Sequence, residues 1–151
     1  MVQRIQSLYL FISLVLYAIL FFTPIFNVQG NNEVYTVFSY KIIPEQNALN
    51  LNVWPICISV SMIFLIQLIA LFSYKRRKLQ IRLLQFNIIL VLLSLVTIGI
   101  YLYHFSGISE DAHIHLTLNV SIPFISAILF YLAIKGIRND QALIDSLNHL
   151  R

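Results

Sequence analysis

The chain has 151 residues, of which 59% are hydrophobic and only 11% are charged. Soluble domains are about one-quarter charged, so this chain has too few polar side chains to cover a soluble fold. Its net charge of +4 comes from ten Lys and Arg residues, and nearly all of them fall in three short segments. This pattern predicts an integral membrane protein.

Four apolar stretches are predicted to cross the membrane as helices. A hydrocarbon core about 30 Å thick needs about 20 helical residues, and each stretch has 19 to 22 residues without Asp, Glu, Lys, Arg or His. The stretches are Ile5–Phe26, Val53–Tyr74, Leu83–Tyr103 and Leu116–Ile134. The sequence therefore predicts an all-α integral membrane protein, a four-helix transmembrane bundle that forms one domain over residues 1–151.

The first stretch could also be read as a secretory signal. Its apolar run is longer than the roughly 7–15 residues of a signal core, and no small-x-small cleavage site follows before Thr23 and Pro24. We expect it to be a retained anchor.

The connection 27–52, between the first and second stretches, is too long for a simple turn between helices. Its segment Glu33–Lys41 is rich in β-branched and aromatic residues and is flanked by Gly30 and Pro44. These features are typical of a strand. We expect a short strand or β-hairpin that packs over the bundle, because a lone hairpin in water is only marginally stable.

The connection 75–82, between the second and third stretches, is strongly basic. It contains Lys75, Arg76, Arg77, Lys78 and Arg82. One interpretation is that this cluster orients the chain in the membrane and does nothing else. The alternative is that it also contacts anionic lipid or an acidic partner. Arg138 and Arg151 in the C-terminal tail are further candidates for such contacts.

Polar residues recur on one side of the third and fourth stretches. They are Asn87, Ser94 and Thr97 on the third, and Asn119, Pro123 and Ser126 on the fourth. Small and hydrogen-bonding side chains are typical of contacts between membrane helices. The alternative is a polar substrate path, although such paths usually carry an ionisable residue. Because Pro123 removes one backbone hydrogen bond, a bend is expected near Asn119 or Val120.

The connection 104–115 contains a cluster of four side chains that can ligate metals, Glu110, Asp111, His113 and His115, with His104 a short distance before them. Two histidines at i and i+2 on an extended segment could converge on a metal ion. The alternative is an ordinary solvated loop. We expect the loop, and therefore no metal and no cofactor.

The tail 135–151 places Leu143, Leu147 and Leu150 at helical spacing. This spacing predicts a short amphipathic helix that lies on the membrane surface or against a partner.

Charge distribution predicts the orientation of the chain. Nine of the ten basic residues lie in the N-terminus, the 75–82 loop and the tail, and Lys41 alone lies in the connections 27–52 and 104–115. The positive-inside rule therefore places both termini and loop 75–82 in the cytoplasm, and the connections 27–52 and 104–115 outside.

Recognisable catalytic motifs are absent from the sequence, which has no Gly-x-Ser-x-Gly, His-Glu-x-x-His or glycine-rich phosphate loop. The single cysteine, Cys57, excludes an intrachain disulfide. We therefore expect no enzyme and no catalytic residue.

Three blocks of sequence resemble an uncharacterised bacterial family of membrane proteins, known as domain of unknown function family 4293. The blocks are Met1–Leu10, Lys75–Leu83, and Leu132–Arg138 with Leu143–Arg151. The resemblance covers the chain end to end and implies a bacterial inner-membrane protein. It supplies no activity, substrate or catalytic residue.

The leading functional hypothesis is a non-catalytic accessory or assembly subunit of an inner-membrane complex. Its expected partners are anionic lipid at the cytoplasmic face and other membrane subunits or further copies of the chain, and not nucleic acid. The alternative is a small homo-oligomeric transporter or channel, since four short helices alone enclose little space.

Overall fold

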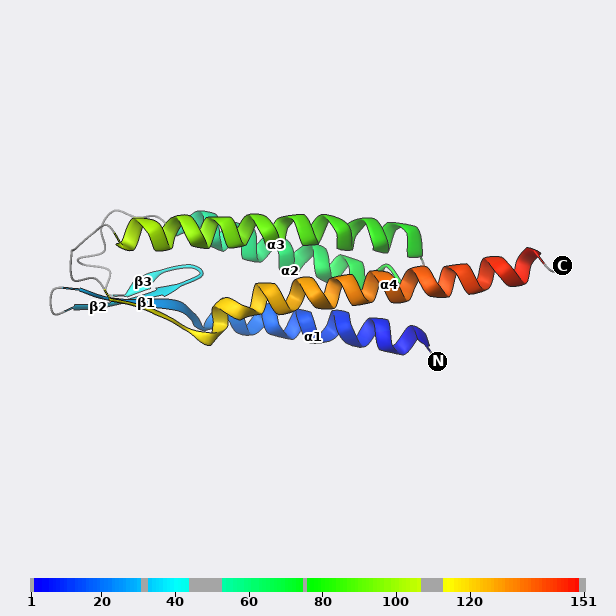
Figure 1. Ribbon diagram of the computed structural model, residues 1–151, viewed down its shortest axis with the longest axis horizontal. Helices are drawn as coiled ribbons and strands as arrows, with labels where there is room; N and C mark the ends of the chain where they lie inside the picture. The colour runs from blue at the N-terminus through cyan, green and yellow to red at the C-terminus, as the bar shows by residue number, and fades with distance from the viewer. Residues whose placement is uncertain (1, 31–32, 44–52, 75, 107–112, 150–151) are drawn as a thin grey trace.

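The computed structural model describes residues 2–30, 33–43, 53–74, 76–106 and 113–149. These residues form four long helices and a small antiparallel sheet (Figure 1). The helices are α1 (Val2–Phe22), α2 (Trp54–Phe72), α3 (Arg77–Ser106) and α4 (Ile122–His149). Each of them is long and apolar enough to cross a membrane. The predicted four-helix transmembrane bundle is therefore confirmed.

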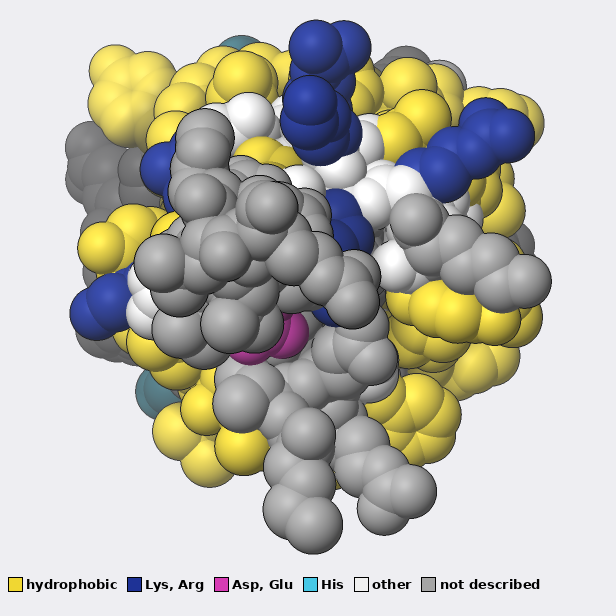
Figure 2. Space-filling view, turned by 90° about the vertical axis from the view of Figure 1, so that its right-hand side faces the viewer, with side chains coloured by type: hydrophobic (Ala, Val, Ile, Leu, Met, Phe, Trp, Pro, Cys, Tyr) yellow, Lys and Arg dark blue, Asp and Glu magenta, His cyan; other side chains and the backbone are white. Residues whose placement is uncertain are grey.

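The two ends of the bundle differ in charge. Both termini lie at one end (Figure 1), together with the start of α3 and the end of α4. We call this the basic end, because Figure 2 looks onto it and shows Lys and Arg side chains spread over its surface. The opposite end carries the sheet and is called the sheet end.

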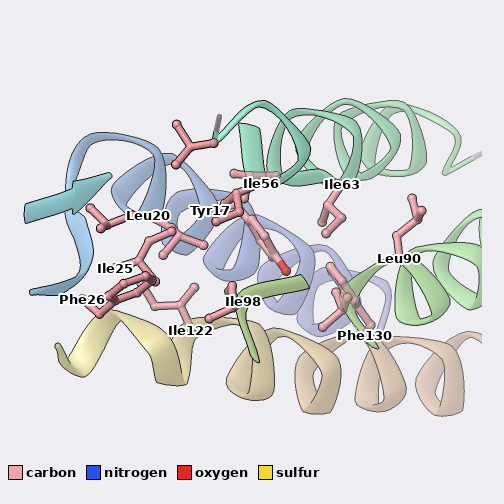
Figure 3. Close-up of a cluster of buried hydrophobic side chains, with 14 of the residues drawn as sticks. Tyr17, Leu20, Ile25, Phe26, Ile56, Ile63, Leu90, Ile98, Ile122 and Phe130 are labelled. Carbon is pink, nitrogen blue, oxygen red and sulfur yellow. The ribbon is translucent and has the colours of Figure 1, made fainter. Parts of the chain in front are cut away.

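The helices pack mainly in two pairs, α1 with α4 and α2 with α3. Apolar and aromatic side chains from all four fill the space between the pairs, among them Tyr17, Ile63, Leu90 and Phe130 (Figure 3). Many large apolar side chains face outward instead, which is the pattern expected of a bundle whose solvent is lipid. The interior is thus a packed core.

The sheet has four antiparallel strands in the order β3-β2-β1-β4. The strands are β1 (Pro24–Gly30), β2 (Glu33–Phe38), β3 (Ile42–Ile43) and β4 (His113–Leu116). The hairpin predicted between the first two helices is confirmed as β1–β2. The fourth strand comes from the connection before α4, so the two connections at this end form one sheet.

The first predicted stretch, 5–26, is wrong at its end. α1 stops at Phe22, and the Thr23 hydroxyl donates a hydrogen bond of 2.8 Å to the Ile19 carbonyl oxygen. Pro24 has no N–H and cannot continue a helix, but it is tolerated as the first residue of a strand. The chain therefore passes directly from α1 into β1.

The fourth predicted stretch, 116–134, is wrong at its start. It begins with β4 and a 3₁₀ turn, Leu118–Ser121, before α4 starts at Ile122 and runs to His149. Pro123 is the second residue of α4, where its missing N–H has no partner to lose within the helix. The bend predicted inside a span is therefore wrong, because the proline lies in the first turn of its helix.

The basic connection is also shorter than predicted. α3 starts at Arg77, so most of the expected loop 75–82 is helical. At its C-terminal end α3 extends past the predicted stretch 83–103 to Ser106. This C-terminal extension of α3 reaches the sheet, where the Phe105 and Phe26 ring centroids lie 5.7 Å apart. The tail likewise is no separate helix, because α4 continues through it.

The register of β1 and β4 can be tested with cysteine pairs in a Cys57→Ser background. Asn27 lies directly opposite His115, and facing Cα atoms about 4.5–5.5 Å apart meet the geometry of a disulfide. We expect Asn27→Cys with His115→Cys to oxidise almost completely, as measured by loss of maleimide labelling. Asn27→Cys with Ile114→Cys is the control, since Ile114 faces Val28. Equal oxidation of both pairs would contradict the register.

Candidate functional site

Gln67 joins α2 to α1 inside the bundle. Its side chain is fully buried, and its Nε2 donates hydrogen bonds to the Leu10 carbonyl oxygen, at 2.9 Å, and to the Ser13 hydroxyl. The Ser13 hydroxyl in turn donates to the Leu10 carbonyl at 3.0 Å. These bonds couple the two helices directly, and such interhelical bonds are typically worth about 0.6 to 2 kcal/mol in membranes.

Asn87 joins α3 to α2 at Ile63, one helical turn of α2 before Gln67. Its Nδ2 donates to the Ile63 carbonyl oxygen at 3.4 Å, and its side chain is fully buried. Ser94 is also buried, but it and Thr97 donate to the carbonyls of Val91 and Leu93 on their own helix. Of the three predicted packing residues on this helix, only Asn87 is seen to hydrogen-bond to another helix.

The candidates near the start of α4 have different surroundings. Asn119 Nδ2 donates to the Pro24 carbonyl oxygen at 2.8 Å and so ties the 3₁₀ turn to β1. Pro123 and Ser126 are buried against the bundle. Thus Asn119 lies at the sheet end, whereas Ser126 lies within the bundle.

Away from the basic end, each helix also contributes one buried polar atom without a hydrogen-bond partner in the described part of the chain. The atoms are Tyr17 Oη, Gln67 Oε1, Asn87 Oδ1 and Ser126 Oγ. Figure 3 shows the Tyr17 hydroxyl pointing into the space between the helices. Buried polar groups are normally satisfied by protein or water. These four atoms could accept or donate bonds to water or to a neutral polar molecule.

A further polar contact, at the basic end, joins α1 to α4. Gln6 Nε2 donates to Asp140 Oδ2 at 2.8 Å, and the Gln6 side chain crosses Gly136. A Cβ atom on Gly136 would lie 2.9 Å from Gln6 Cγ. The absence of a side chain at this position therefore allows Gln6 to reach Asp140.

A basic hollow of about 540 Å³ lies beside the start of α3. Its lining includes Arg76, Arg77, Lys78, Arg82 and, from α4, Gln141. Arg77 Nη1 is buried and has no hydrogen-bond partner among the described residues. The N-terminus of a 30-residue helix adds positive potential here. The hollow can therefore bind an anionic group.

The remaining candidates are spread over both ends. Arg138 is exposed on α4, while Lys75 and Arg151 lie outside the described residues. At the sheet end His115 faces Asn27 across β1–β4, His113 is on the same strand, and Glu110 and Asp111 are not described. Among the residues that the structure describes, no three His, Cys, Asp or Glu side chains come together.

Sequence reasoning missed Gln67 and the Gln6–Asp140 pair. Gln67 could have been found, because it is the single amide in α2 and polar residues within membrane helices commonly hold helices together. The Gln6–Asp140 contact could not, since its members are 134 positions apart. No periodicity within either helix relates them.

Two glycine substitutions test the Gln6–Asp140 contact. Ala is favoured over Gly in a helix by roughly 1 kcal/mol, and a Cβ on Gly99 would meet nothing within 4 Å. Gly99→Ala should therefore leave the free energy of unfolding in detergent unchanged or raise it slightly. Gly136→Ala should lower it by about 1 kcal/mol, because Gln6 must move and its partly buried hydrogen bond to Asp140 is lost.

The same measurement in a Gln6→Ala background supplies the control. Without the Gln6 side chain, Gly136→Ala should no longer destabilise the protein. If Gly136→Ala were as harmless as Gly99→Ala in the parent chain, the close contact with Gln6 would be contradicted.

Comparison with known proteins adds a family but no activity. No curated protein matches the chain. The family described as Domain of unknown function (DUF4293) matches residues 2–150, which agrees with the resemblance carried by the three sequence blocks. The chain therefore belongs to this family of unknown function.

Proposed function

We propose that the protein is a non-catalytic accessory or assembly subunit of an inner-membrane complex, and that a partner docks at its basic end. The observation that carries the proposal is the basic hollow, in which Arg77 Nη1 has no hydrogen-bond partner among the described residues. A guanidinium N–H buried without an acceptor is costly, and a carboxylate or phosphate group can remove that cost through short, charge-assisted bonds.

Charge balance within the chain supports an external partner for the hollow. Four of its lining residues are cationic. Asp140 on α4, next to the lining residue Gln141, contributes one negative charge, so the four cations remain in excess. An acidic segment of another subunit would complement this excess of positive charge. Anionic lipid headgroups at the same face are further expected contacts.

The proposal that the protein is not an enzyme rests on side-chain chemistry. The central parts of the helices carry amides and hydroxyls, whereas general acid–base and metal chemistry requires ionisable or ligating groups. The amides Gln67 and Asn87 donate hydrogen bonds between helices. Such groups suit the stability of a bundle.

We further propose that the protein lies in a bacterial inner membrane with its basic end in the cytoplasm. This orientation follows from the positive-inside rule, because Lys41 is the one basic residue in the two connections at the sheet end. A partner at the basic end would then be cytoplasmic or would expose an acidic cytoplasmic segment.

The alternative function, a homo-oligomeric transporter or channel, is favoured by the four buried polar atoms of the bundle interior that have no partner in the part of the chain that the structure describes. They come from all four helices and could line a path for a neutral polar molecule. Tyr17, Ile63 and Phe130 fill the interior of one copy, however. Such a path would therefore require several copies or a rearranged bundle.

Gentle detergent extraction followed by native mass spectrometry separates these functions. The accessory function predicts that larger, different subunits co-purify with the chain. A closed ring of identical chains would favour the transporter. A monomer that carries only lipid would contradict both proposals.

Arg77 variants test the docking site in the same experiment. Because Lys lacks the forked donors of Arg, Arg77→Lys should lower the yield of the co-purified subunit roughly tenfold. Lys135→Gln is the matched control, since Lys135 is exposed on α4 and does not line the hollow. Equal losses in both variants, at equal abundance of the chain, would show that bulk charge rather than the Arg77 site holds the partner.

A further inference from the structure

An apolar groove of about 350 Å³ runs between α1 and α2 near the sheet end. Its walls are the last turns of α1 and the middle of α2, and the lining includes Ala18, Phe21 and Phe22 on α1 with Ser61, Phe64 and Leu65 on α2. The volume falls within the roughly 300–1,000 Å³ of small-molecule pockets. A helix about 10 Å across would not fit, whereas an extended hydrocarbon chain would.

The turn between β2 and β3 is fastened over the end of α1. The Phe38 N–H donates to the Lys41 carbonyl oxygen at 2.8 Å, which closes a two-residue turn. The buried Ser39 hydroxyl donates to the Leu20 carbonyl oxygen at 3.0 Å. The Tyr40 ring stacks on Phe21, with centroids 5.8 Å apart and an angle of 18° between the planes. The turn therefore continues directly from a wall of the groove.

This turn positions a cation beside the Tyr40 ring, which stacks on the groove residue Phe21. Lys41 Nζ lies 5.5 Å from the Tyr40 ring centroid and 6.0 Å from that of Phe38. Contact with ring faces leaves an ammonium group free to donate hydrogen bonds to an anion. Lys41 is also the one Lys or Arg in either connection at the sheet end.

We propose that the groove and Lys41 together bind one anionic phospholipid. One acyl chain lies between α1 and α2, and the headgroup phosphate accepts hydrogen bonds from the Lys41 ammonium. The groove is almost wholly apolar along its length. Its Phe21 wall is linked to a cation through the Tyr40 ring, so an apolar channel and a positive charge follow one another as the acyl chain and the phosphate do in a phospholipid. The site lies at the opposite end from the basic hollow and does not depend on the proposed docking function.

Photo-crosslinking of the full-length protein in nanodiscs tests the proposal. The probes are phosphatidylglycerol and phosphatidylcholine with the same diazirine-bearing acyl chain, and the sites are mapped by mass spectrometry. We expect phosphatidylglycerol to label the groove residues of α1 and α2 at least about threefold more than phosphatidylcholine. Lys41→Gln should abolish this preference and Lys41→Arg should retain it. Lys135→Gln, which removes an exposed cation on α4, should change nothing.

Groove-filling variants test where the acyl chain lies. Ala18→Leu and Ser61→Leu add bulk from opposite walls, so each should reduce groove labelling several-fold. Gly99→Leu, whose added side chain starts in open space on α3, should leave it unchanged. Thermal unfolding identifies a variant that fails to fold. The variant on the opposite wall of the groove then provides the test. Labelling spread evenly over lipid-facing helices, no preference between the lipids, or a protein segment found in the groove would overturn the proposal.

Discussion

The cost of leaving a polar group unpaired in hydrocarbon governs this structure. It requires the backbone to be helical across the membrane, and it confines the described charged side chains to the two ends. Inside the bundle, the amide nitrogens of Gln67 and Asn87 meet this requirement by donating to backbone carbonyls of neighbouring helices, whereas their amide oxygens have no hydrogen-bond partner among the described residues. The same bonds hold α1, α2 and α3 together, so satisfying these polar groups also contributes to the packing of the bundle.

The sequence predicted the four spans because their signal is one of length and composition. It misplaced their ends where a different interaction takes over. Pro24 and Leu116 were both counted within spans, yet each belongs to a strand, because β1 and β4 pair with each other beyond the helices. That pairing joins segments about 90 positions apart (Asn27 with His115), and local periodicity does not report it. The hairpin β1–β2, by contrast, is local and was predictable.

The candidate sites divide in the same way. The basic cluster was evident from the sequence, but the buried Nη1 of Arg77 and the participation of Gln141 depend on how α3 lies beside α4. In the sequence, Lys41 stood out only as the one basic residue in the two connections expected outside the cytoplasm. Its role in the proposed lipid site follows from the turn that the Ser39 hydroxyl and the Tyr40 ring fix to α1. The sequence therefore predicts which charged residues belong to a candidate site, but not which side chains from other elements lie beside them.

The proposed docking site requires that the two ends of the bundle face different compartments, with the basic end in the cytoplasm. Single cysteines in a Cys57→Ser background test this directly, at the exposed positions Gln29 and His115 of the sheet end and Asn139 and Ala142 of the basic end. An impermeant maleimide added to intact cells should label only Gln29→Cys and His115→Cys, and all four should react after the cells are opened. Labelling of Asn139→Cys or Ala142→Cys in intact cells would contradict the orientation and, with it, a cytoplasmic docking site.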